Sequence, residues 1–319
     1  MKIKELLFTE RYRPSDISEL ILPDRIYKNF ADGISTHLML YGSAGTGKTS
    51  TAKAICKTFN YPYLYINASL DTGVDTVRNT ITDFCSTRTL THQDSDFKIV
   101  ILDEVDGVSI QFFKALRSTM DEFKKNTRFI TTCNYINKVP EPIQSRFELI
   151  SFDYTKDEED EMIKKYILRL HDICSKESLT IENAALYELI KRKFPDMRSM
   201  LNSIQGFKNQ KIEKITVADV IKFNSIFKDV YELIFNNIDP VKNYQYLIGN
   251  YSTKVDDVLA SLGNDFIEYI KDEKPNYIKY IPQIIITVCK YQAVQHNVID
   301  PTISMLACIY ELGNIIHNL

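Results

Sequence analysis

The fold is decided by the stretch Tyr41-Gly42-Ser43-Ala44-Gly45-Thr46-Gly47-Lys48-Thr49-Ser50, which holds three of the chain's ten glycines. The apolar run 37–41 precedes this stretch, and a helical pattern follows it. Glycines allow the backbone to curl so that its N–H groups point at phosphate oxygens, and the positive end of the following helix adds to the attraction. The stretch therefore predicts a phosphate-binding loop, formed by residues 42–50, between a strand and a helix.

Lys48 and Thr49 extend this prediction from a phosphate to a nucleotide with its metal ion. In a loop of this pattern the lysine contacts the β- and γ-phosphates, and the threonine hydroxyl binds Mg²⁺, which prefers oxygen ligands in octahedral geometry. We therefore expect ATP and Mg²⁺ as cofactors. The alternative is a merely flexible glycine-rich turn, which the complete motif disfavours.

A second, acidic element follows the apolar strand expected at 98–102. Here the chain reads Asp103-Glu104-Val105-Asp106, so carboxylates emerge at the end of a buried strand. We expect Asp103 to hold Mg²⁺, directly or through water, and Glu104 to polarise the water that attacks the γ-phosphate. Asp106 is expected to cap a helix.

Two further residues fit an in-line displacement at phosphorus. Asn134 follows the strand expected at 128–133, where it can bond the attacking water or the γ-phosphate, or simply form the turn at the strand end. Arg146 can neutralise charge in the transition state, which commonly accelerates phosphoryl transfer by about 10³-fold or more. Taken alone, an arginine in this position is more simply explained by a surface salt bridge.

Outward from the loop, short β-branched runs alternate with amphipathic stretches between about Thr36 and Phe152. This alternation is typical of βαβ units around a parallel sheet, so the fold class is α/β. The ligands of such open sheets usually lie at the carboxyl ends of the strands. The predicted strands are His37–Tyr41, Tyr63–Asn67, Lys98–Asp103, Arg128–Cys133 and Glu148–Phe152.

Helical periodicity replaces the strand pattern after Phe152, beginning with an acidic segment at 155–161 that is typical of a capped helix start. The helices predicted there are Lys156–Ser175, Ile181–Phe194, Asp196–Phe207 and Val217–Phe223. From about Lys228 the helical pattern resumes, with breaks expected at Pro240, Pro275 and Pro301. We therefore predict an α/β domain at 1–153, a small helical domain at 154–226 and an all-helical domain at 227–319.

Composition narrows the class of protein. The six cysteines include no CxxC pair, which argues against a zinc cage or a disulfide framework. A net charge of −3 disfavours attraction of the whole molecule to nucleic acid, although a local basic surface can still bind phosphates. The first residues mix charges and lead into no long apolar stretch, so we expect no signal peptide, no membrane span and a cytoplasmic location.

Taken together, the motifs resemble those of the ATPase subunits of DNA sliding-clamp loaders in the AAA+ superfamily, over about residues 8–207. The resemblance is closest to the small subunit of T-even-type phage loaders and of replication factor C. Besides the loop and the acidic element, it rests on Glu10-Arg11-Tyr12-Arg13-Pro14, Ala115-Leu116-Arg117, Asn137 to Arg146 and Asp196-Met197-Arg198. The chain departs from the family pattern at Phe113, Ser118 and Phe147.

The resemblance implies roles for particular residues. Tyr12, Arg13 and Pro14 would line the adenine pocket, and Asn134 would be a first sensor of the γ-phosphate. Arg146 would act on ATP bound by the neighbouring subunit, whereas Arg198 would contact the γ-phosphate as a second sensor. The helical domains would be a lid and a collar, and the collar would hold a five-membered assembly with other loader subunits.

The resemblance also implies contacts with primer–template DNA through its backbone. Arg78 and Lys138 match family positions at helix starts that face this backbone, although each also fits a solvated surface charge. Such contacts position DNA without reading its sequence. The predicted function is a DNA-stimulated ATPase that opens a sliding clamp and loads it onto primed DNA during replication. The alternatives are an AAA+ DNA motor, such as a helicase or branch-migration ATPase, and a catalytically weak scaffold.

Overall fold

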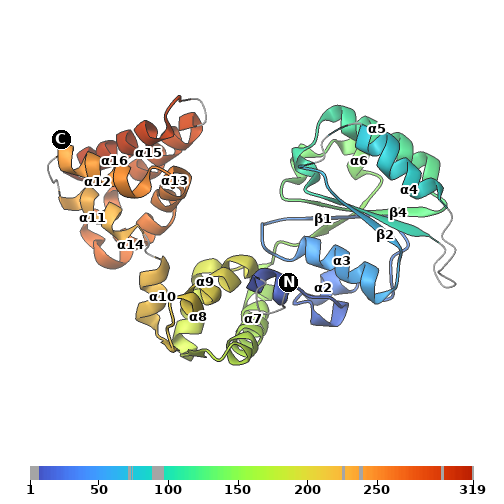
Figure 1. Cartoon of the computed structure of the whole chain (residues 1–319), viewed down its shortest axis with the longest axis horizontal. Helices are drawn as coiled ribbons and strands as arrows, with labels where there is room; N and C mark the ends of the chain where they lie inside the picture. The colour runs from blue at the N-terminus through green and yellow to red at the C-terminus, as the bar shows by residue number, and fades with distance from the viewer. Residues whose placement is uncertain are drawn as a thin grey trace. The chain divides into compact units, whose positions relative to one another are not determined.

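The computed structural model describes residues 7–70, 73, 75–87, 97–224, 227–236, 240–295 and 298–317. Its contacts divide the chain into two compact units, Met1–Val217 and Ala218–Leu319. The first unit contains a sheet covered by helices together with a smaller helical part, and the second unit is helical (Figure 1). The sequence prediction put its last boundary nine residues later, after residue 226, and its division into three domains stays a prediction.

Five parallel strands form the sheet of the first unit, in the order β2-β3-β4-β1-β5. Their bounds are Leu38–Tyr41 (β1), Tyr63–Asn67 (β2), Lys98–Asp103 (β3), Thr127–Cys133 (β4) and Glu148–Ser151 (β5). The predicted strands agree with these bounds to within one residue, which confirms the α/β class. Because Tyr41 pairs with Cys133 and Asn67 pairs with Asp103, the segments that follow these strands emerge at one edge of the sheet.

The central strand β3 shows why this sheet is buried on both faces. Its residues alternate between two apolar clusters, Ile99 and Ile101 in one, Val100 and Leu102 in the other, and every residue of the strand is buried. A strand covered by helices on both sides reads as a continuous apolar run, because neither face meets water. The run 98–102 therefore follows from the architecture.

Helices cover the two faces of the sheet. One cluster includes residues of α2 (Asp24–Tyr27) and α3 (Lys48–Thr58), and the other includes residues of α4 (Thr82–Ser86) and α5 (Ile110–Phe123). Figure 1 shows α2 and α3 below the sheet and α4 and α5 above it. Short helices complete the first part of the unit: α1 (Phe8–Arg11), η2 (Ile17–Glu19), η3 (Thr76–Ile81), η4 (Val105–Gly107), η5 (Ile136–Lys138) and α6 (Glu141–Gln144).

The rest of the first unit is the predicted small helical part. It comprises α7 (Lys156–Lys176), α8 (Asn183–Lys193), α9 (Met197–Asn209) and a two-stranded parallel pair, β6 (Thr180–Ile181) with β7 (Lys214–Ile215). Helix α7 begins with a capping box, in which Thr155 and Glu158 each accept a backbone N–H of the other. The acidic start predicted from the sequence is therefore confirmed as a capped helix.

Helices make up the described part of the second unit. They are α11 (Lys228–Asn236), α12 (Pro240–Tyr251), α13 (Val255–Gly263), α14 (Asp265–Glu273), η6 (Pro275–Tyr280), α15 (Ile281–Val294) and α16 (Pro301–His317), after α10 (Val217–Asn224) at the division. Three of these elements begin at the prolines where breaks were predicted, because proline fits the first turn of a helix but not its interior. One apolar cluster, drawn from α11 to α16, forms the core of this unit.

Several residues singled out in the sequence belong to cores. Phe113 and Phe147 are buried in the cluster that α5 shares with the sheet, whereas Ser118 is exposed. Five cysteines are buried and Cys289 is exposed. Among the described residues, no helix is both long enough and apolar enough to cross a membrane.

Candidate active site

The predicted phosphate-binding loop lies between the end of β1 and the start of α3. Gly42, Gly45 and Gly47 all have positive φ angles, of 130°, 74° and 95°. At Gly45 a side chain would also collide with the protein, since a Cβ there would lie 1.8 Å from Oδ1 of Asp196. Residues other than glycine rarely adopt such angles, so the glycines are what allow this loop to form.

Lys48 is the first residue of α3 and is 7% exposed. Its ammonium lies inside the loop, where Nζ donates to the carbonyl oxygens of Gly42 and Ser43, each at 2.8 Å. Burial is the main cause that lowers the pKa of Lys48, and the acidic groups around it oppose this shift. The cation therefore sits in the loop where the sequence predicts phosphate binding.

Asp103, the last residue of β3, is buried and accepts hydrogen bonds at both carboxylate oxygens. Thr49 donates to Oδ1 at 2.7 Å, Thr132 also donates to Oδ1, and Tyr65 donates to Oδ2 at 2.8 Å. The carboxylate and the Thr49 hydroxyl thus lie side by side, as two oxygen ligands of one metal ion would. Oxygen donors of this kind suit Mg²⁺, so the residues present fit the predicted ion.

Glu104 follows directly and has a left-handed backbone, with φ 60° and ψ 49°. This conformation is uncommon for a residue other than glycine and is frequent at functional sites. Two contacts hold it: its N–H donates to the hydroxyl of Thr132 at 3.0 Å, and its Oε2 accepts from the hydroxyl of Ser69 at 2.9 Å. The side chain is exposed and lines the pocket, at the place expected for a group that polarises water.

Asn134 lies just beyond the end of β4 and lines the same pocket. Its position depends on Asp106, whose Oδ2 lies 3.3 Å from the backbone nitrogens of both Asn134 and Tyr135 and accepts from them. The expectation that Asp106 caps a helix is wrong, because Asp106 lies within η4 and Ser109 caps α5. Its carboxylate instead holds the segment that follows the neighbouring strand. Sequence reasoning had no signal for this pairing, since the partners are backbone groups.

A single pocket brings most of the predicted residues together. Its lining combines the amino-terminal segment, the loop, the ends of β3 and β4, and helices α7 and α9. The predicted residues that line it are Tyr12, Arg13, Pro14, Ala44, Gly45, Thr46, Gly47, Lys48, Thr49, Ser50, Glu104, Asn134 and Arg198. Gly42, Ser43 and Asp103 lie next to the lining residues in the chain rather than among them.

The amino-terminal segment is attached to the small helical part by a buried carboxylate that sequence reasoning missed. Glu177, at the end of α7, accepts hydrogen bonds from Arg11, Tyr12 and Lys208. Burial is the largest single influence and acts to raise the pKa of Glu177, but the three hydrogen bonds together lower it. Burial, followed by the bond to Glu177, raises the pKa of Tyr12 to about 12. Tyr12, one of the residues predicted to line the adenine pocket, is therefore bonded to the same part of the molecule that carries Arg198.

Arg146 lies away from this pocket. Its Nε and one terminal nitrogen donate to the two carboxylate oxygens of Asp121, at 3.1 and 3.0 Å, and the other terminal nitrogen donates to the carbonyl of Pro142 at 2.7 Å. This bond from Arg146 is the main cause that lowers the pKa of Asp121. The salt bridge weighed for Arg146 is thus present, and the guanidinium does not line the pocket of its own chain.

Of the two residues predicted to contact DNA, Lys138 is not among the residues that line the pocket. Lys138, in η5, is exposed, and its Nζ lies 4.8 Å from the centre of the Tyr135 ring. Arg78 belongs to η3, but its side chain lies outside the described residues. An exposed lysine needs only charge and reach to bind phosphate.

Known proteins resemble this chain over both parts of the first unit. Residues 38–153 match the family described as "ATPase family associated with various cellular activities". Residues 158–216 match the family described as "Sliding-clamp-loader large subunit, AAA+ ATPase lid domain". The chain therefore binds a nucleotide through its sheet domain, and its small helical part is a lid.

Individual relatives agree with these matches. The replication factor C small subunit of Saccharolobus solfataricus is 35% identical over 244 residues, covering 73% of this chain and 71% of the relative. The sliding-clamp-loader large subunit of phage T4 is 30% identical over 282 residues, covering 86% and 79%. The phage relative is designated a large subunit, whereas the resemblance predicted from the sequence was to the phage small subunit.

A solved structure of the Thermotoga maritima RuvB Holliday junction branch migration motor has a TM-score of 0.53 and 19% identity, covering 84% of this chain and 90% of that one. At this identity it supports the fold alone. The sequence relatives are more informative, because their identity reaches 30% or more over most of both chains. The chain belongs to the sliding-clamp-loader family of AAA ATPases, which includes the replication factor C small subunits.

Proposed function

We propose that the chain is one subunit of an ATP-driven assembly that opens a sliding clamp and loads it onto primer–template DNA during replication. The observation that carries this proposal is one pocket formed jointly by the phosphate-binding loop and a lid of the sliding-clamp-loader type. The relatives named above are loader subunits, which supports loading over the DNA motor considered as the alternative. We also propose that the chain divides into a nucleotide-binding domain, a lid and a collar, with the boundaries predicted from the sequence.

Within this function the loop would hold ATP, and Thr49 and Asp103 would hold Mg²⁺. The ion, when bound, neutralises charge on the phosphates. Lys48 would exchange its bonds to two loop carbonyls for bonds to phosphate oxygens. Glu104, held by Ser69 and Thr132, would accept a proton from the attacking water, and Asn134 would orient that water.

The arginines make the site depend on assembly. Arg198 comes from the lid into the pocket of its own chain, where it would contact the γ-phosphate. Arg146 is already ordered by Asp121 but lies outside that pocket, which supports a role on ATP bound by a neighbouring subunit. Such an arginine is worth about 10³-fold or more in phosphoryl transfer, so an isolated subunit would hydrolyse ATP slowly.

The second unit would hold the neighbours together in a pentamer. Apolar side chains are exposed on α15 and α16, among them Ile285, Ile286, Val294 and Ile303, which are 42% to 69% exposed. Exposed apolar groups gathered on two helices are typical of surfaces that other subunits cover. Lys138 and Arg78 would contact the DNA backbone inside the assembly, and DNA binding would stimulate hydrolysis.

The decisive experiment separates loading from translocation. The complex, purified with its partner subunits, is mixed with a ring clamp and primed circular DNA, and clamp retained on the DNA is measured with ATP or with a non-hydrolysable analogue. We expect retention with ATP and stalled intermediates with the analogue. Processive unwinding of duplex DNA by the complex without any clamp would refute the proposal.

Glu104→Gln tests the catalytic part and the scaffold alternative together. Glutamine keeps the size of the side chain and an oxygen for the Ser69 hydroxyl, but it cannot accept the proton. We expect ATP binding to persist while turnover collapses by about 10²-fold or more, the contribution typical of a general base. Unchanged turnover would remove Glu104 from the mechanism and favour a subunit that uses ATP only for assembly.

A further inference from the structure

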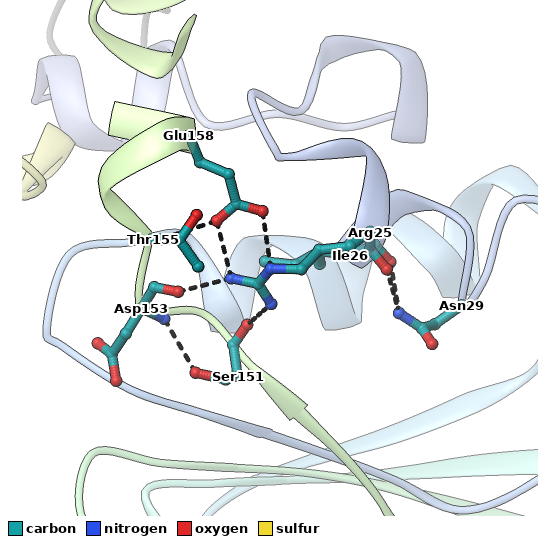
Figure 2. Close-up of polar contacts among 7 residues, drawn as sticks. All are labelled: Arg25, Ile26, Asn29, Ser151, Asp153, Thr155 and Glu158. Atoms are coloured by element: carbon teal, nitrogen blue, oxygen red, sulfur yellow. Dashed lines mark hydrogen bonds and ion pairs between the residues drawn. The ribbon is translucent and has the colours of Figure 1, made fainter. Parts of the chain in front are cut away.

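The chain passes from the sheet to the lid through a short segment, residues 152–155, between the end of β5 and the start of α7. Arg25, which belongs to α2, holds this segment through hydrogen bonds to Ser151, Asp153 and Glu158, and we call this set of bonds the Arg25 grip. Figure 2 shows its guanidinium surrounded by acceptors from the strand end, the connecting segment and the helix start. None of the residues that supply these acceptors lines the nucleotide pocket.

The contacts of Arg25 use all three guanidinium nitrogens. One terminal nitrogen donates to the carbonyl of Ser151 at 2.7 Å, and the other donates to the carbonyl of Asp153 at 2.6 Å. Nε and that second nitrogen also donate to the two carboxylate oxygens of Glu158, at 2.8 and 3.2 Å. A lysine could not reproduce this planar, forked arrangement. The sheet, the connection and the lid helix therefore share one cation.

Glu158 makes the grip directional. The same carboxylate accepts the N–H of Thr155 at 2.9 Å, as the glutamate of the capping box. The first turn of α7 is thus oriented by Arg25 as well as by its own cap. The ion pair is partly exposed, at 39% for Arg25 and 18% for Glu158, so the charge attraction alone would contribute little. The Arg25–Glu158 pair matters because its forked geometry fixes the direction of the first turn of α7.

Asp153 connects this grip to the phosphate-binding loop. Its carbonyl faces Arg25, whereas its carboxylate points the other way in Figure 2. That carboxylate accepts both the N–H and the hydroxyl of Ser43, at 2.8 and 2.7 Å. Space between the two segments is minimal, because a Cβ on Gly42 would lie 2.9 Å from Oδ1 of Asp153.

Within the phosphate-binding loop, Ser43 also contacts Lys48, whose ammonium donates to the Ser43 carbonyl. A phosphate in the loop competes for this ammonium, so it alters the bonding of the same residue that Asp153 holds. Arg25 also lies three residues after Leu22, the last of three consecutive residues, 20–22, that line the nucleotide pocket. Occupation of the pocket by phosphate and by the rest of the nucleotide therefore reaches the connecting segment from two sides.

We infer that Arg25 is a positioning residue, which, with Asp153 and Glu158, makes the direction of lid helix α7 depend on occupation of the phosphate-binding loop. This inference rests on the proposed function, because the group that the lid delivers is Arg198. Its consequence is specific. Loss of the grip leaves the loop able to bind a nucleotide but removes the response of the lid, and with it the preference for a γ-phosphate.

The test measures lid position and nucleotide affinity on the full-length chain. Spin labels are attached to cysteines introduced at Lys57 in α3 and Leu168 in α7, both exposed, in a Cys289→Ser background that removes the exposed native thiol. Pulsed dipolar spectroscopy gives the distance between the labels without nucleotide, with ADP and with a non-hydrolysable ATP analogue. Binding of fluorescent forms of both nucleotides is measured on the same variants.

Two variants remove the grip in different ways. Arg25→Ala removes every contact. Glu158→Gln keeps the capping box, which accepts glutamine, but puts an amide N–H₂ where the carboxylate accepts from Nε of Arg25, so the forked bond is lost together with the charge pair. Arg192→Ala is the matched control, since it removes an arginine–glutamate pair with Glu188 within α8 of the lid. For wild type and control we expect a distance distribution that shifts with the ATP analogue.

For Arg25→Ala and Glu158→Gln we expect the same distance distribution with and without the ATP analogue. We also expect that the ADP affinity is unchanged and that the preference for the ATP analogue over ADP is lost. A nucleotide-dependent shift in Arg25→Ala equal to that of wild type would overturn the inference, and so would a wild-type distance that ignores nucleotide. Neither result bears on clamp loading, which the retention assay decides separately. Conversely, if the complex fails to load clamps, the distances between the labels still decide whether Arg25 couples the lid to nucleotide.

Discussion

Replacing Thr132 by valine is the sharpest test of how the two carboxylates at the end of β3, those of Asp103 and Glu104, are held. Thr132 lies in β4 and is 1% exposed. Its single hydroxyl serves both acidic residues, because it donates to Oδ1 of Asp103 and accepts the N–H of Glu104 at 3.0 Å. Valine has nearly the same shape, so the change removes these two bonds and leaves the packing almost intact.

The size of the effect follows from those two bonds. A hydrogen bond to a charged group is worth about 1.5–3 kcal/mol, and a backbone N–H left without an acceptor costs about 1–3 kcal/mol when it is buried. Since the N–H of Glu104 is only partly buried, we expect a total loss of about 2–4 kcal/mol in the free energy of unfolding. Turnover should fall as well, because Asp103 and Glu104 lose a shared support.

The preceding residue is an internal control. Thr131 is also 1% exposed, but among the described residues its hydroxyl has no hydrogen-bond partner. Thr131→Val replaces an unsatisfied buried hydroxyl with a methyl group, so we expect stability to be unchanged or to rise by about 1 kcal/mol. The two variants have the same composition and differ only in which threonine is removed.

Urea unfolding followed by circular dichroism measures the difference, since the chain has no tryptophan. The two compact units can unfold separately, so the relevant transition is the one that nucleotide moves to higher urea. We expect the midpoint of Thr132→Val to fall by about 1 M or more, given usual slopes in urea. Equal midpoints and equal ATP turnover for the two variants would refute this account of the site.

Three further predictions concern other parts of the first unit. Arg146→Ala should lower ATP turnover of the assembly by about 10³-fold with nucleotide binding intact, and mixing it with Lys48→Ala subunits should restore some activity if the arginine acts across the interface. Gly45→Ala should weaken nucleotide binding, measured by calorimetry, because its Cβ would meet Asp196 and its φ is positive. Burial lowers the pKa of His37 to about 4, so the folded state favours the neutral ring. The contribution of His37 to stability should therefore be complete above about pH 6.5, the pKa of an unfolded histidine, and be lost as the pH falls towards 4. A urea midpoint that stays constant over this range would contradict this prediction.

Much of the site was accessible from the sequence because phosphate and metal chemistry requires particular residue types at fixed spacings. The glycines, Lys48 and Thr49 lie within one short segment, and Asp103 and Glu104 end a run of apolar residues that only a buried strand explains. The strand ends themselves could be predicted to within one residue, since burial on both faces leaves a strong apolar signal. These features depend only on residues that are close together in the chain, so they can be predicted from the sequence.

The supporting contacts were not accessible, because their members are far apart in the chain and chemically ordinary. Ser69 and Thr132 are hydroxyl residues like many others, and only the pairing of neighbouring strands brings them to Glu104. Glu177 looks like a solvated residue at a helix end until Arg11 and Lys208 are seen around it. No spacing rule marks such partners.

The phosphate-binding loop, the two carboxylates at the end of β3 and the order of the motifs were therefore determined by the sequence itself, since each needs only neighbouring residues and backbone geometry. The tertiary structure alone decided that Arg146 lies outside the pocket of its own chain and Arg198 lies within it. It also brought Arg25 to Glu158, 133 residues away, and Asp153 to Ser43, 110 residues away. Contacts over such separations exist only after the sheet and the lid have packed, because packing, and not spacing along the chain, decides which polar groups meet.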